Sequence, residues 1–505
     1  MQERTKNSIK NIIMGLLSNI IVLLLSFISR KIFINFLGVE LLGINGLFSN
    51  VLQLLSLADL GFGTAMSFSF YKPLAEDDKA KIAALTSFYK KVYNIIACGI
   101  AIIGIALLPF LKYIVTTEQE IPHLQLYYLV FLTNTVVSYL FVYKSSILNA
   151  AQKNYLISRW TIIVNVVKLL IQILVLFVCK NYFAYISVTI FTTLLNNLII
   201  SRIADKIFPE IKEKAILEKK EQKEIFKNLK SVFIYKISGV LLNSMDAILI
   251  SKLISVAMVG YYSNYQTIIS NLTQIITIIF TSLTASLGNL MLTETSKTRY
   301  RIFKTMSMVS FYLSTLVATC IFVVSDDFIT IWLGEEFVLS KWVVMAISFN
   351  IFFSTSMQPL WSFREAIGLY NKTKYVMLIA AILNLILSIV LGIYFGLAGI
   401  IAATVLAKIS TYFWYEPHLL FKQYFDVSEI RYYVEYIVNV VLLLVCSISL
   451  NIILSQMICN NLGIWLLKCL ICLIFITFIY LIIYYKSEQF KYLLSKTKEL
   501  LIIKK

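Results

Sequence analysis

The chain has 505 residues, of which 59% are hydrophobic and 14% are charged, and its formal net charge is +18. Soluble globular proteins have about a quarter of their residues charged. This composition, with a mean hydropathy of +0.81, therefore excludes an ordinary soluble protein and indicates a polytopic membrane protein. The positions of the cations then matter more than their sum, and the sequence has no basic soluble domain that would bind nucleic acid.

Apolar segments long enough to span a membrane follow one another along the chain. About 20 apolar residues cross a hydrocarbon core of about 30 Å. Because backbone groups in lipid must bond within their own segment, and these runs are too long and too evenly apolar for barrel strands, the predicted class is all-α. The fourteen predicted spans lie near residues 11–36, 41–67, 92–115, 125–148, 160–179, 182–203, 231–251, 259–286, 305–325, 342–363, 375–395, 397–416, 433–454 and 463–485.

The loop cations predict the orientation of these spans, because Lys and Arg in short loops stay on the cytoplasmic side. With both termini inside, the cations in outer loops are few: Lys112, Lys180, Lys252 and Lys341. The N-terminal apolar run has a basic start but no small-residue cleavage site after it, so we expect an uncleaved first helix. The sequence thus predicts a multi-pass protein with cytoplasmic N- and C-termini.

Residues 26–79 carry the most distinctive pattern in the chain. It combines an arginine, a glycine turn followed by two further glycine pairs, an apolar run with one aspartate and a polar exit, in the order Arg30, Leu37-Gly38, Leu42-Gly43, Asn45-Gly46, Leu57-Ala58-Asp59-Leu60-Gly61-Phe62-Gly63 and Tyr71-Lys72-Pro73. This pattern resembles the first helix pair of bacterial polysaccharide flippases. These are the lipid-linked oligosaccharide exporters of the multidrug/oligosaccharidyl-lipid/polysaccharide exporter superfamily. The likeness continues along the whole chain in helix number and loop pattern.

The chain also shows an internal repeat. Arg159-Trp160 opens the fifth predicted span, and the similar pair Lys374-Tyr375 opens the eleventh. The offset between them equals six spans, and six is even, so the two halves share one orientation as a parallel repeat of six-helix lobes around a central cavity. The resemblance implies that the two extra C-terminal helices pack against the second lobe. The predicted domains are an N-terminal lobe at 1–207, a cytoplasmic amphipathic linker at 208–230, a C-terminal lobe at 231–418, and the last two helices with a basic tail at 419–505.

The linker is rich in lysine, with apolar residues such as Ile211, Ala215 and Ile225 among the cations. This pattern predicts a surface helix whose cations face anionic lipid headgroups. The tail after Tyr485 has the same character. The alternative for both segments is solvated charge.

Ionisable residues within the apolar spans are the candidates for a binding site, because each costs about 2.5 to 3.5 kcal/mol to insert. Cations outnumber acids among them, which suits a phosphate-bearing headgroup, and arginine binds such a group as a planar fork. The residues predicted to bind substrate are Arg30, Lys31, Asp59, Lys236, Asp246 and Arg364. Arg30 and Asp246 are separated by about the same number of residues as the two halves of the internal repeat, so they occupy corresponding positions. The alternative is structural: cations that reach the interface, and acids that pair with neighbouring helices. That structural role is the one we favour for Lys408 and Lys468.

Arg30 and Lys236 are expected to hold a pyrophosphate, while Asp246 and Asp59 orient these cations. No ATP-binding or metalloprotease motif is present, and the two histidines, His123 and His418, are too far apart in sequence to predict a metal site. We therefore expect no catalytic residue, metal or cofactor.

The resemblance implies a flippase that moves undecaprenyl-pyrophosphate-linked oligosaccharides from the inner to the outer leaflet of a bacterial plasma membrane. Its products would feed the synthesis of capsule, exopolysaccharide or O-antigen. The expected partners are this lipid-linked substrate, membrane lipids and a polysaccharide polymerase.

Three alternatives stay open: a peptidoglycan-precursor flippase, a multidrug cation antiporter of the same superfamily, and a membrane-embedded glycan polymerase or acyltransferase. A proton, a sodium ion or the membrane potential are the candidate energy sources.

Overall fold

The computed structural model describes residues 2–56, 62–117 and 120–502, and its regular elements are all helical. Contacts divide the chain into two compact units, Met1–Gly260 and Tyr261–Lys505, which we call the first and second unit. Eleven described helices are long and apolar enough to cross a membrane, or twelve if one bent pair forms a single span. The predicted all-α membrane class is confirmed. The predicted division into lobe, linker and lobe stays a prediction.

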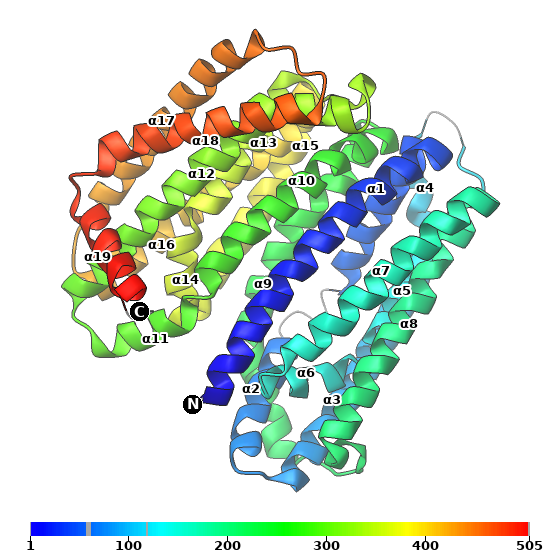
Figure 1. Cartoon of the computed structure of the whole chain (residues 1–505). Coiled ribbons are helices and arrows are strands. Elements are labelled where there is room, and N and C mark those ends of the chain that lie inside the picture. The colour runs from blue at the N-terminus through cyan, green and yellow to red at the C-terminus, as the bar shows by residue number, and fades with distance from the viewer. Residues whose placement is uncertain (1, 57–61, 118–119, 503–505) are drawn as a thin grey trace. The chain divides into compact units, whose positions relative to one another are not determined.

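The first unit contains the helices up to α9, coloured blue to green in Figure 1. Within it α8 packs between α5 and α7, and α1 packs along α7. The elements are α1 (Gln2–Leu55), α2 (Phe62–Ala75), α3 (Lys79–Ala106), η2 (Leu108–Phe110), α4 (Leu111–Ile114), α5 (Leu124–Tyr139), α6 (Val142–Ala150), α7 (Asn154–Cys179), α8 (Tyr182–Ile207), η3 (Pro209–Lys212) and α9 (Lys219–Leu253).

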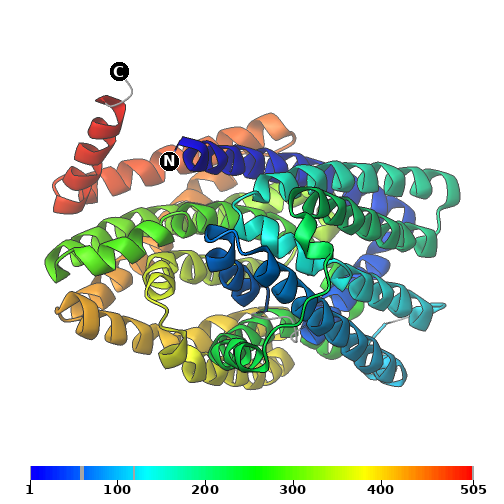
Figure 2. The same ribbon diagram turned by 90° about the horizontal axis from the view of Figure 1, so that it is seen from below.

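The second unit begins within α10 and is organised around α12, which contacts α13, α17 and α18. Figure 2 shows the last helix, α19, running across the direction of α18. The elements are α10 (Val256–Thr281), α11 (Thr284–Thr293), α12 (Ser296–Trp332), η4 (Glu335–Phe337), α13 (Lys341–Ser356), α14 (Gln358–Ala366), α15 (Tyr370–Ser410), α16 (Tyr412–Leu420), η5 (Phe421–Phe425), α17 (Ile430–Ser455), α18 (Leu462–Tyr484) and α19 (Glu488–Ile502).

Two glycines account for the difference between the expected fourteen spans and the observed eleven or twelve. Gly38 has φ 82° inside α1, and Gly396 has φ 59° inside α15, so each interrupts a helix that otherwise runs on as one element. Positive φ is a conformation that glycine adopts without the steric cost of a Cβ. The predicted turn at Leu37-Gly38 is thereby confirmed, and Gly396 lies between two of the predicted spans.

Two further glycines permit a close helix crossing inside the first unit. A Cβ added at Gly43 in α1 would lie 2.0 Å from the Val256 carbonyl oxygen, and one added at Gly260 would lie 2.4 Å from the Val39 carbonyl oxygen. Only glycine lets two backbones approach this closely. The Leu42-Gly43 part of the sequence pattern therefore has a packing role.

Helix boundaries repeat along the chain at a fixed offset. The short helices α6 and α14 begin at Val142 and Gln358, and the long helices α7 and α15 begin at Asn154 and Tyr370. The two separations are identical, and we call this separation the repeat offset. Corresponding helices of the two units can therefore be compared residue by residue.

The linker differs from the predicted surface helix. Residues 209–212 form a 3-10 turn, the next residues are not helical, and α9 then continues from Lys219 to Leu253 as one helix of 35 residues. The Ser87 hydroxyl of α3 donates to the Glu213 carbonyl at 3.3 Å and accepts from the Ala215 N–H at 3.4 Å. The prediction of a surface helix is wrong for residues 208–218, which form a 3-10 turn and then a non-helical segment that these bonds attach to α3.

The last long helices are joined to α12 by polar contacts. The Lys468 ammonium of α18 lies 2.7 Å from the Asp327 carboxylate, and the Tyr480 and Thr315 hydroxyls lie 2.8 Å apart. Lys468 is only 4% exposed. The packing of the extra helix pair against the second half, which the resemblance implied, is confirmed within the second unit.

Candidate functional site

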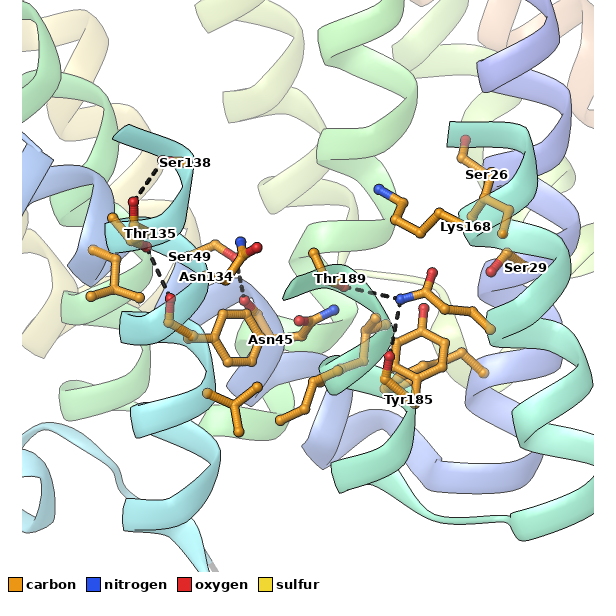
Figure 3. A pocket seen from close by; sticks show the side chains of 18 of the residues that line it. Ser26, Ser29, Asn45, Ser49, Asn134, Thr135, Ser138, Lys168, Tyr185 and Thr189 are labelled. Carbon is orange, nitrogen blue, oxygen red and sulfur yellow. Dashed lines mark hydrogen bonds between the residues drawn. The ribbon is translucent and has the colours of Figure 1, made fainter. Parts of the chain in front are cut away.

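The first unit contains a cavity of about 670 Å³ between α1, α5, α7 and α8. This volume lies in the range of sites that bind small molecules. Its lining is more polar than expected for a membrane-embedded surface, as Figure 3 shows. The polar lining residues are Ser26, Ser29, Arg30, Asn45, Ser49, Gln53, Ser56, Asn134, Thr135, Ser138, Lys168, Gln172, Tyr185 and Thr189.

The charge of the cavity comes from two cations, Arg30 on α1 and Lys168 on α7. The described lining residues include no Asp or Glu. In the structure as described, Lys168 makes no ion pair or hydrogen bond. Because a cation without a protein partner is costly at this depth, the arrangement favours an anion supplied by a ligand.

The surroundings of Arg30 hold that end of the cavity in place. Ser29 and Tyr185 line the cavity beside it, and the Tyr185 ring packs edge-on against Phe33 with 4.9 Å between centroids. Arg30 and Tyr185 also interact electrostatically. The arginine is thus presented from a packed aromatic wall, which limits its freedom before any ligand binds.

Gln172 joins α7 to α8 at the cationic end of the cavity. Its Nε2 donates to the Tyr185 carbonyl and to the Thr189 hydroxyl, both at 3.2 Å, and Figure 3 shows both bonds. These bonds tie α7 to α8 one helical turn after Lys168. Gln172 is therefore a positioning residue for the helix that carries the lysine.

The opposite end of the cavity is polar but uncharged. It is formed by α1 and α5, with Asn45, Ser49, Asn134 and Ser138 among its residues. Figure 3 places Asn134, Ser138 and Ser49 together, away from Lys168. The cavity therefore has a cationic end and a neutral end.

The structure distributes the predicted site residues over several places. Arg30 lines the cavity. Lys31 is exposed and does not line it, and Lys236 and buried Asp246, both on α9, do not line it either. Asp59 lies outside the described residues.

The remaining predicted residue, Arg364, lies in the second unit. Its Nη1 is 2.7 Å from a carboxylate oxygen of Glu416, and its Nη2 is 3.8 Å from Glu365. The Arg364 and Glu416 side chains are 6% and 2% exposed. This contact gives Arg364 a structural role within its own unit, and its predicted role in substrate binding stays a prediction.

Sequence reasoning did not place Lys168 in the site, and it missed Gln172 and Asn134. A signal was present in the spacing. Lys168 and Gln172, like Asn134 and Ser138, are polar pairs four residues apart in apolar runs, so each pair occupies one helix face.

Comparison with known proteins shows the family of this chain and the structures whose fold it shares. The family model described as "Polysaccharide biosynthesis protein" matches residues 8–287, and no curated protein matches the chain. The fold is similar to that of the lipid II flippase MurJ in an inward closed conformation, with a TM-score of 0.69 and 16% identity over 94% of this chain and 99% of that one.

Two multidrug transporter structures are similar to a lesser degree. One is an inward-facing MATE family transporter of the MOP superfamily, with a TM-score of 0.57 and 13% identity over 78% of this chain and 93% of that one. The other is the Vibrio cholerae MATE transporter VcmN, with a TM-score of 0.55 and 15% identity over 85% and 100%. The matched family model covers more than half of the chain, so the protein belongs to the polysaccharide biosynthesis protein family, and its fold is similar to the folds of these three solved structures.

Proposed function

We propose that the protein flips undecaprenyl-pyrophosphate-linked oligosaccharide repeat units from the inner to the outer leaflet of a bacterial plasma membrane. These units would supply capsule, exopolysaccharide or O-antigen synthesis, with a polysaccharide polymerase as the partner that consumes them. The observation that carries the proposal is the cavity with Arg30 and Lys168 and no acid among its described lining residues. Two cations match the two negative charges of a diphosphate diester.

The architecture proposed for this transport is two six-helix lobes in a parallel repeat, followed by helices 13 and 14. The breaks at Gly38 and Gly396 support fourteen crossings, because each divides a stretch that is long for one span, 33 residues at Leu23–Leu55 and 56 residues at Tyr370–Phe425. The helix starts that recur at the repeat offset support the two-lobe arrangement. Cytoplasmic termini follow from the loop cations, and the domain bounds proposed from the sequence stand with this scheme.

The driving force proposed here is the membrane potential. Moving one charge through 100 mV is worth about 2.3 kcal/mol, and an inside-negative potential favours outward movement of an anion. Coupling to a proton or sodium ion through Asp246, Glu365 or Asp59 is the alternative. A flipping assay in vesicles, with the potential and the ion gradients set separately, distinguishes the two.

A second candidate is a peptidoglycan-precursor flippase, favoured by the likeness to the lipid II flippase MurJ. Rescue of a strain that lacks lipid II flipping would support it over the oligosaccharide substrate. A multidrug cation antiporter would need acidic groups facing its ligand, and the described cavity lining has none. Protection of an exporter-deficient host against cationic drugs would favour the antiporter.

Arg30 provides the direct test of the proposal. Arg30→Ala should impair flipping severely without lowering the amount of protein in the membrane, and Arg30→Lys, which keeps the charge but loses the planar fork, should impair it in part. Lys31→Ala is the matched control, since Lys31 is the exposed neighbour outside the cavity lining. Continued appearance of the lipid-linked unit on the outer leaflet in cells that lack the protein would refute the proposed function.

A further inference from the structure

The neutral end of the cavity contains a polar pair on α5, Asn134 and Ser138, whose hydrogen bonds are not all made within the helix. Asn134 and Ser138 lie one turn apart (Figure 3). The Ser138 hydroxyl donates its proton to the Thr135 carbonyl at 2.7 Å, so its oxygen can only accept further bonds. The Asn134 Oδ1 atom is buried and has no hydrogen-bond partner among the described residues. A buried polar atom without a partner needs an explanation, because it loses the hydrogen bond that water would give it.

The second unit contains the same pair with its partner present. Asn350 and Ser354 on α13 are the counterparts of Asn134 and Ser138 at the repeat offset. The Lys408 ammonium donates to the Asn350 Oδ1 at 3.1 Å and to the Ser354 hydroxyl at 3.0 Å.

At the position equivalent to Lys408 the first unit has Thr192. The Thr192 hydroxyl donates to carbonyls of its own helix at 3.0 and 3.1 Å. In the second unit the chain therefore supplies a donor to the Asn–Ser pair. In the first unit the equivalent pair faces the cavity.

The neighbouring hydroxyls of the neutral end also present acceptors. Ser49, Ser56 and Thr135 each donate their proton to a carbonyl of their own helix, at 2.7, 2.8 and 3.0 Å. Their oxygens therefore offer lone pairs toward any ligand. A carboxylate, which only accepts hydrogen bonds, cannot bond to these hydroxyls and could use only the amide N–H groups of this end, such as that of Asn134.

The positive charge of the cavity limits which ligand group can donate hydrogen bonds to Asn134 and Ser138. A cationic donor would share the cavity with Arg30 and Lys168, and their positive charge disfavours it. An uncharged O–H or N–H group satisfies the acceptors without that repulsion. The Phe131 ring, which also lines the cavity, offers an apolar surface to the carbon–hydrogen face of a sugar ring.

We propose that Asn134 and Ser138 form a glycan subsite that accepts hydrogen bonds from an uncharged sugar next to the diphosphate. The transporter then prefers a neutral sugar to an acidic one at that position. The inference rests on the proposed function, in which Arg30 and Lys168 hold the diphosphate at the other end of the cavity.

The test measures binding of three synthetic diphosphate diesters to the purified full-length protein by calorimetry: geranyl diphosphate capped as its methyl ester, called geranyl diphosphate hereafter, the same lipid diphosphate carrying N-acetylglucosamine, and the same lipid diphosphate carrying glucuronic acid. The wild type should bind the N-acetylglucosamine probe about tenfold more tightly than geranyl diphosphate, and the glucuronic acid probe no more tightly. Asn134→Leu should lose the gain from the sugar and keep the affinity for geranyl diphosphate. Ser138→Ala is a milder second variant for the same comparison.

Thr133→Ala is the matched control. Thr133 lies on the same helix, is exposed, and makes the same kind of bond to its own backbone at 2.8 Å, so its loss should change neither affinity. A wild-type sugar gain retained in both Asn134→Leu and Ser138→Ala, equal or tighter binding of the acidic probe, or Asn134-dependent binding of Na⁺ would overturn the subsite. Failure of geranyl diphosphate itself to bind would overturn the proposed function and, with it, this inference.

Discussion

The α5 and α7 helices of the first unit and the α13 and α15 helices of the second share one pattern of starts and breaks, yet they use their polar residues differently. In α7, Lys168 and Gln172 line the cavity. The equivalent residues of α15 are Asn384 and Ser388. The Asn384 Nδ2 donates to Ser388 at 3.3 Å and to Thr404 at 3.1 Å, and all three are buried.

Equivalent helices therefore use polar side chains in two ways: to bond helices together, or to line a cavity. In the second unit these groups bond to one another and hold helices together. In the first unit the equivalent residues line a cavity: Gln172 bonds to α8, and Lys168 has no hydrogen bond or ion pair in the structure as described. Substitutions in the second unit should therefore act mainly on stability, and those in the first unit mainly on transport.

The largest effect is expected at Arg364 in the second unit. Arg364→Ala leaves the buried Glu416 carboxylate without its 2.7 Å partner. Removal of one partner from a buried ion pair costs about 3–5 kcal/mol, so thermal unfolding in detergent and membrane abundance should both fall. The double substitution Arg364→Met with Glu416→Leu removes both charges and should recover most of the loss. A stable Arg364→Ala protein that no longer transports would instead assign Arg364 to the substrate.

The next effect is expected at Lys168 in the first unit. A hydrogen bond to a charged group contributes about 1.5–3 kcal/mol, so Lys168→Ala should reduce flipping about ten- to a hundredfold. Thermal stability should not fall, because no described protein contact of the ammonium is lost. Lys180→Ala, at the exposed C-terminal end of the same helix, is the control. Reduced abundance with normal transport per molecule would make Lys168 a structural residue.

A smaller effect should follow from placing in the first unit a lysine like Lys408, which bonds to the Asn–Ser pair of the second unit. Thr192→Lys places an ammonium at the position equivalent to Lys408, where it should bond to Asn134 and Ser138. Since one neutral hydrogen bond contributes about 1 kcal/mol, the affinity ratio between sugar-bearing and bare geranyl diphosphate should fall about fivefold. Thr192→Met has similar length without the donor and is the control. An unchanged ratio would mean that the two units are not equivalent at this position.

The smallest effect is expected at the exposed pair His418–Glu429, whose contribution to stability can be compared with that of the buried pair Arg364–Glu416. The His418 ring nitrogen lies 2.8 Å from the Glu429 carboxylate, and this hydrogen bond lowers the pKa of Glu429 below its usual value. A lowered folded-state pKa adds stability above the unfolded pKa of about 4.3, and the gain is lost as pH falls through the folded pKa.

Because the pair is largely exposed, the effect should be a few tenths of a kcal/mol. His418→Ala should lower the melting temperature slightly at pH 7 and leave it unchanged well below pH 4. An equal change at both pH values would show that packing of the ring, not its bond to Glu429, contributes the stability.

The sequence predicted the helices well because hydropathy and glycine act locally. Runs of apolar residues mark the spans wherever they fold, and the Gly38 break follows from the residue itself. The linker was not predicted, since its non-helical segment is attached by the Ser87 bonds to a helix far earlier in the chain. Such a tertiary contact leaves no periodic signal in the linker.

The candidate site was predictable only in part for a similar reason. Arg30 follows from the cost of a charge in an apolar run. Lys31 follows from the same argument, but consecutive helical residues point about 100° apart, and only Arg30 lines the cavity. That Lys168 and Asn134 share this cavity depends on how four helices pack, which no single run of residues specifies.

The continuous helix α9 also has a mechanical consequence. At about 1.5 Å per residue, its 35 residues form a rod of about 52 Å, longer than the hydrocarbon core of about 30 Å. Near its first turn, the Glu221 carboxylate pairs with Lys81 of α3. A continuous helix tilts as one body. A rotation of the membrane portion of α9 would therefore change the distance between Glu221 and Lys81, and the ion pair opposes that rotation.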